Sequence, residues 1–113
     1  MNGRISIRQK AALERLIRIA QAGTGQGRMT ADFLLSWWNA RNFGGFDLTR
    51  LWNVDPEIAA DMVTVFTFVA KCRRFPDDLG YEEEFRRIVH TWRAIEELAV
   101  HKNEEASCAV LAS

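Results

Sequence analysis

The chain has 113 residues, with 15 Lys and Arg against 15 Asp and Glu and a hydrophobic fraction of 48%. This composition is typical of one globular domain and excludes collagen-like, low-complexity and wholly disordered chains. Two cysteines are too few for a disulfide scaffold, and no apolar run reaches the roughly 18 residues of a membrane span. Since the chain also begins without the apolar core of a signal peptide, we expect a cytoplasmic protein with no membrane partner.

Amphipathic segments separated by glycine or proline predict an all-α fold, a compact bundle of four main helices. The first helix is expected at about 6–22, where apolar residues share one broad arc. The glycine-rich segment 23–27 then ends it, because glycine adopts the left-handed conformation of a helix stop. The second helix is expected at about 30–41, with Thr30 as its N-cap.

The third helix is expected at about 55–72. Asp55 is a suitable cap and Pro56 suits the first helical turn. The β-branched run from Met62 to Val69 also fits a strand, but the Asp-Pro-Glu start favours a helix. Because this segment is apolar around nearly its whole circumference, we expect it to be the central helix of the bundle.

The fourth helix is expected at about 81–100, where seven large or apolar residues share one face. Residues 1–100 are therefore predicted to form a single helical domain. Residues 101–113 are predicted to form a C-terminal tail, as a short helix or a segment at a subunit interface. The connecting loop 42–54 is rich in Trp, Phe and Gly and has room for a short helix.

The sequence contains no recognisable set of catalytic or metal-binding residues. His90 and His101 are the only histidines, and their separation matches no helical metal pair. We therefore predict a non-enzymatic protein without cofactor or metal. A tight polar pocket around His90 would instead favour an enzyme.

The basic and acidic residues are divided unevenly along the chain. Residues 1–50 carry a formal charge of +5 and residues 51–113 a charge of −5. If the first helix extends back to residue 4, four arginines form a basic stripe along it: Arg4, Arg8, Arg15 and Arg18. Such a stripe suits phosphates or an acidic protein surface. The alternative is a contact within the molecule, with the acidic edge of the fourth helix, or a head-to-tail dimer.

The loop region is unusually aromatic, with three tryptophans and two phenylalanines in the segment 37–52. We favour a self-packed loop beneath the bundle. The alternative is a surface that binds a partner, because Trp, Tyr and Arg dominate interface hot spots. On that hypothesis the binding residues are Trp38, Arg41, Phe43, Phe46 and Trp52.

Five short motifs together resemble a small uncharacterised domain family of proteobacteria, over about residues 11–97. They are Ala12-Leu-Glu-Arg-Leu, Thr24-Gly-Gln, Ala31-Asp-Phe-Leu-Leu-Ser-Trp-Trp-Asn, Gly44-Gly-Phe-Asp-Leu and Leu51-Trp-Asn-Val-Asp. Members of that family are often encoded on plasmids and on integrative or conjugative elements. The resemblance implies no catalytic residue, ligand or fold, only a setting as accessory cargo of mobile DNA.

These features lead to one main functional hypothesis and one alternative. The main one is a small helical protein that acts by binding another protein, for example as an anti-CRISPR-type inhibitor of a host defence complex. The alternative is a nucleic-acid-binding accessory factor that uses the basic first helix. A homodimer is compatible with either hypothesis.

Overall fold

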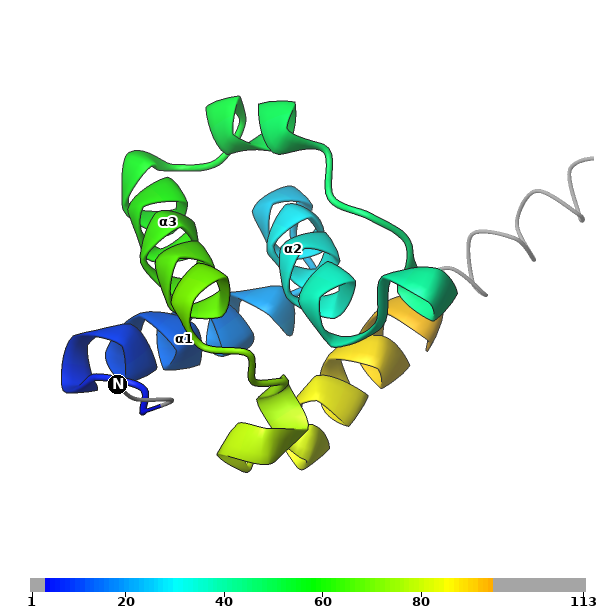
Figure 1. Cartoon of the computed structure of the whole chain (residues 1–113). Helices are drawn as coiled ribbons and strands as arrows, with labels where there is room; N and C mark the ends of the chain where they lie inside the picture. Colours follow the sequence, from blue (N-terminus) through cyan, green and yellow to red (C-terminus); the bar gives the residue numbers. More distant parts are fainter. Residues whose placement is uncertain (1–3, 95–113) are drawn as a thin grey trace, which may run out of the picture.

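The computed structural model describes residues 4–94 and shows an all-α fold (Figure 1). Its elements are α1 (Ile7–Ala20), α2 (Gly25–Phe43), the 3-10 helix η1 (Leu48–Trp52), α3 (Pro56–Lys71), the 3-10 helix η2 (Pro76–Leu79) and a fourth helix at residues 82–94. No strand occurs in this part of the chain. The all-α class, the four main helices and the short helix in the loop are confirmed.

Helix α1 begins and ends within two residues of its expected bounds. Ser6 caps it reciprocally with Gln9: the Gln9 backbone N–H donates to the Ser6 hydroxyl, and the Ser6 N–H donates to the Gln9 side chain, both at 3.0 Å. Its buried face contacts both α2 and α3, so α1 is the helix on which the other two pack.

Helix α2 begins five residues earlier than predicted. Thr24, not Thr30, is its N-cap and accepts a 3.0 Å hydrogen bond from the backbone N–H of Gly27. Thr30 is fully buried inside the helix, where its hydroxyl donates to the carbonyl of Gln26. The glycines of segment 23–27 therefore divide between two roles. Gly23, at φ +31°, follows the end of α1, whereas Gly25 and Gly27 belong to the first turn of α2.

Helix α3 forms as expected, but it is not central. Pro56 is its first residue, and the side chain of Gln26 accepts a 2.6 Å hydrogen bond from the backbone N–H of Asp55. The Asp55 carboxylate makes no capping hydrogen bond. One face of α3 packs into the core, while Val63 and Phe66 on another face stay more than half exposed. Although α3 is apolar around nearly its whole circumference, it is therefore not buried on all sides, and the expectation of a central helix is wrong.

Helix 82–94 packs against α1 through its buried face. Tyr81, Phe85, Ile88 and Trp92 are buried, and the indole N–H of Trp92 donates to the carbonyl of Ala20 at 2.7 Å. The expected continuation to residue 100 and the tail 101–113 lie outside the described residues. Within residues 4–94, no helix has an apolar stretch of the length and composition needed to span a bilayer.

A second hydrogen bond to α1, from Tyr81 to Glu14, leads to a prediction about the effect of pH on stability. The Tyr81 phenol donates a 2.8 Å hydrogen bond to Oε2 of Glu14, and burial together with this acceptor raises the pKa of Tyr81 above its ordinary 10.0. We expect stability to be fully present below about pH 10 and to fall above it, because the unfolded tyrosine loses its proton first. Tyr81 is the only tyrosine, so phenolate absorbance during alkaline titration reports this group alone. The Glu14→Gln variant should titrate at lower pH than wild type, and a wild-type titration at the ordinary value would contradict the contact.

Candidate functional site

Two of the aromatic residues proposed for partner binding are packed against helix 82–94. Trp38 stacks on Phe43, with ring centroids 5.8 Å apart and an interplanar angle of 24°. Trp38 also meets the buried ring of Phe85 edge-on at 5.8 Å. Both Trp38 and Phe43 are partly buried. Most of their apolar surface therefore serves the fold, as the expectation of a self-packed loop requires.

A third member of the set, Phe46, packs on the other side of α2. Its ring meets Phe33 edge-on at 5.3 Å.

Trp37, which precedes Trp38 in α2, is also packed inside the fold. It contacts Phe68 and Phe85, and its indole N–H donates to the carbonyl of Arg74 at 3.0 Å. The adjacent tryptophans of α2 therefore point in different directions yet share one buried phenylalanine.

The two remaining members of the set are exposed. Arg41 lies in the last turn of α2, and Trp52 ends η1 with 82% of its surface exposed. The five residues therefore do not form one continuous surface. Trp38 and Phe43 face helix 82–94, whereas Phe46 faces α3 through a hollow that it helps to line.

A different exposed surface emerges between η1 and α3. Four large apolar residues of these two elements are more than half exposed: Leu48 at 64%, Trp52 at 82%, Val63 at 55% and Phe66 at 58%. We call this set the η1–α3 surface. Only Trp52 belongs to the residues singled out from the sequence. The sequence did contain a signal that Val63 and Phe66 are exposed. The segment of α3 is apolar around nearly its whole circumference, and contact with a single core cannot bury every side of a helix.

The η1–α3 surface includes the rim of an apolar hollow of about 260 Å³. The residues that line it are Phe33, Phe46, Leu48, Leu51, Met62, Val63 and Phe66. Its lining comes from α2, from α3 and from the segment between them, which Figure 1 shows running from α2 through η1 to the start of α3. A second hollow of similar size adjoins it and reaches along α3 to Val69.

The basic stripe does not form as four residues on one helix. Arg4 precedes the N-cap Ser6 and is not helical. Arg15 donates two hydrogen bonds of 2.8 Å to the Asp61 carboxylate, and this contact raises the pKa of Arg15. Arg8 and Arg18 remain exposed on α1. The acidic partner was expected on the fourth helix, but for Arg15 it is Asp61 of α3. This ion pair also gives a role to Asp61, the single carboxylate in the middle of that apolar helix.

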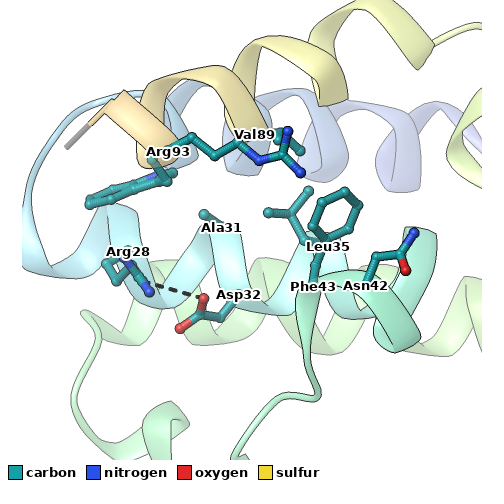
Figure 2. Close-up of a pocket in the computed structure, with 9 residues that line it drawn as sticks. Arg28, Ala31, Asp32, Leu35, Asn42, Phe43, Val89 and Arg93 are labelled. Carbon is teal, nitrogen blue, oxygen red and sulfur yellow. Dashed lines mark ion pairs between the residues drawn. The ribbon is translucent and has the colours of Figure 1, made fainter. Parts of the chain in front are cut away.

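A further hollow lies between α2 and helix 82–94 (Figure 2). Arg28 forms an ion pair with Asp32 at 3.5 Å, and its guanidinium carbon lies 5.3 Å from the centre of the Trp92 ring. Figure 2 shows Arg93 reaching from helix 82–94 across this hollow toward Phe43. Arginine, valine and aromatic residues surround His90 in the adjoining hollow, and no carboxylate or thiol lines that hollow. Residues 4–94 also contain no cluster of metal-binding side chains.

Comparison with known proteins places the chain in a family. No curated protein and no solved structure matched it. A family model described as a family of unknown function, DUF7673, matches residues 10–93. The matched span begins in α1 and ends in helix 82–94, so it contains the whole η1–α3 surface and its hollows. Because the match covers most of the chain, the protein belongs to this family of unknown function.

Proposed function

We propose that this protein acts by binding another protein through the η1–α3 surface. The observation that carries the proposal is the set of four exposed apolar side chains on η1 and α3, three of which line a preformed hollow with an entirely apolar lining. Contiguous exposed apolar patches on soluble domains commonly mark binding sites. Removing such surface from water is favourable by about 25 cal/mol per Å² of apolar area.

Trp52 is the strongest single candidate for an energetic hot spot. It is 82% exposed, and it follows directly on Leu51, which lines the hollow. Tryptophan is enriched among hot spots because its large rigid ring loses little conformational entropy on binding. The 3-10 helix η1 thus presents an aromatic ring that is largely exposed to solvent.

The finer form of the proposal is an inhibitor of a host defence complex, carried by a mobile element and acting in the bacterial cytoplasm. Its support is the resemblance of the sequence motifs to a family common on such elements. The η1–α3 surface would supply the exposed binding site that such an inhibitor needs.

We expect Trp52→Ala to raise the dissociation constant for the partner by about 30-fold or more, the effect of losing a hot spot of about 2 kcal/mol. The same substitution should leave the melting temperature unchanged, because the ring is exposed. The measurement is capture of partner from nuclease-treated bacterial lysate by the tagged full chain, followed by titration of the captured protein against both variants.

Ile7→Ala is the matched control, because Ile7 is 91% exposed on α1 and lies outside the η1–α3 surface. It should bind like wild type. Equal binding by wild type and by Trp52→Ala would contradict the proposal. Capture that disappears with nuclease would also contradict it and would favour nucleic acid bound by the exposed arginines of α1.

A further inference from the structure

The hollow between α2 and helix 82–94 combines charged and aromatic side chains, and we call it the Arg93 hollow (Figure 2). Its volume is about 170 Å³. An apolar cavity of roughly 150 Å³ is large enough to bind benzene, so the Arg93 hollow has room for a molecule of about one ring. It shares no residue with the η1–α3 surface.

The apolar part of the Arg93 hollow is held in place by the fold. Leu35 of α2 is buried, and so is Trp92, whose indole N–H donates to the carbonyl of Ala20. The ring of Phe43 is stacked on Trp38. Because these walls are already packed, a ligand that enters the hollow loses little free energy to their rearrangement.

A break in α2 forms one end of the Arg93 hollow. Asn39 is not helical, with φ −161° and ψ 85°, and its side-chain oxygen accepts a 3.2 Å hydrogen bond from the backbone N–H of Asn42. Asn39 thus caps a last short turn, as asparagine does at helix starts. This turn carries Asn42 and Phe43, both of which line the hollow.

Three charged side chains line the Arg93 hollow, and one of them has no charged partner there. Arg28 forms the 3.5 Å ion pair with Asp32. Arg93 forms no ion pair or side-chain hydrogen bond with another residue of the range 4–94, and Figure 2 shows it reaching across the hollow toward Phe43. The lining therefore carries one positive charge in excess, beside an apolar wall.

We infer that the Arg93 hollow binds a small organic monocarboxylate whose apolar body is about the size of one ring. The guanidinium of Arg93 can donate two parallel hydrogen bonds to a carboxylate. The apolar body then lies against Leu35 and Phe43. A single negative charge matches the single excess positive charge, whereas the second charge of a phosphate would be repelled by Asp32. The inference goes beyond the proposed function and does not depend on it.

The carboxylate could belong to a free small molecule or to an acidic side chain of a protein. An aspartate or glutamate side chain brings the charge but no apolar body of one ring. It would leave the apolar wall of the hollow in contact with water and gain little from hydrophobic burial. The size of the hollow and its apolar wall therefore favour a free molecule.

The test is an NMR titration of the full chain with sodium benzoate at constant ionic strength. Benzoate should give saturable shifts of the Arg93 Nε–H and Leu35 methyl signals, with a dissociation constant of about 1 mM, as is usual for a ligand of this size. Benzyl alcohol has the ring without the charge, and acetate has the charge without the ring. Each should bind at least about tenfold more weakly, because each lacks one of the two contacts.

Three results of this titration overturn the inference. The first is the absence of saturable shifts with benzoate, which would also follow if a carboxylate of residues 95–113 already occupied the Arg93 guanidinium. The second is benzyl alcohol that binds as tightly as benzoate, since the charge would then play no part. The third is acetate that binds as tightly as benzoate, since an acidic side chain would then serve equally well.

Substitution of Arg93 tests the position of the carboxylate. Arg93→Gln should weaken benzoate binding about tenfold or more, because it removes the charge-assisted hydrogen bonds. Arg87→Gln is the matched control, since Arg87 is exposed on the same helix but does not line the hollow. It should bind benzoate like wild type. The spectra show directly whether both variants are folded, and equal affinities of the two variants overturn the inference.

Discussion

Replacing Phe85 by alanine is expected to lower the free energy of unfolding by about 3–5 kcal/mol, the usual range for a buried phenylalanine. Phe85 is fully buried on helix 82–94 and is the ring that both Trp37 and Trp38 contact edge-on. Its removal therefore costs the transfer free energy of the ring and leaves a cavity beneath two tryptophans. The measurement is chemical denaturation monitored by tryptophan fluorescence.

The matched control is Phe75→Ala, because Phe75 is 55% exposed between α3 and η2. It should change the free energy of unfolding by less than about 1 kcal/mol. Since small domains are stable by only about 5–15 kcal/mol, the Phe85 variant should be largely or partly unfolded at raised temperature. Equal effects of the two substitutions would show that the aromatic cluster does not hold helix 82–94 to α2.

Gly27→Ala is expected to destabilise the protein by about 1–3 kcal/mol, the typical cost of forcing an extra carbon into a packed site. A Cβ at this position would lie 2.7 Å from the carbonyl oxygen of Ile19, and backbone cannot move aside as a flexible side chain can. The start of α2 would have to withdraw from the end of α1, at the corner where Thr24 caps α2. Thermal melting measures the effect.

Gly25→Ala is the control within the same turn, because a Cβ there meets nothing within 4 Å. It should be neutral or raise stability by up to about 1 kcal/mol, since alanine favours the helix and restricts the unfolded chain. If both substitutions destabilise equally, the cost lies in helix initiation and not in the contact with Ile19.

The sequence predicted those parts of the fold that depend on local, periodic signals. The apolar arc of the first segment predicted α1, and the single apolar face from Tyr81 to Trp92 predicted helix 82–94. The start of α2 was missed because glycine is a poor helix former. There two effects outweigh propensity: the local cap, in which the Gly27 N–H donates to Thr24, and the close approach of Gly27 to Ile19, which only the packing of α2 against α1 creates.

The candidate site was less predictable, because periodicity does not state which apolar surface the chain itself covers. Trp38 and Phe43 looked available but pack on each other and on Phe85. Val63 and Phe66 looked like core but remain exposed. Arg15 looked like part of a binding stripe, yet its partner Asp61 lies 46 positions away in the sequence, a pairing that only the folded arrangement of α1 and α3 creates.

The η1–α3 surface accounts for what the sequence left unexplained, namely why α3 is apolar on more sides than the core requires. Under the proposed function, α3 supports the fold through its buried face and presents Val63 and Phe66 to a partner through another face. Leu48 and Trp52 extend that surface onto η1, and Phe46 helps to line the hollow that Leu48 shares with Val63 and Phe66. The proposal thus assigns stability and binding to different residues, so substitutions can test the two separately.

The most direct test of this assignment is site-specific photo-crosslinking in living bacteria, with a photoreactive phenylalanine analogue placed at position 52 or, as the control, at position 7. Position 52 should give one dominant protein adduct, either with a second copy of the chain or with a distinct protein, and position 7 should give none. Adducts at position 7 that match those at position 52, or none at position 52 in a folded protein, would contradict a binding role for the η1–α3 surface.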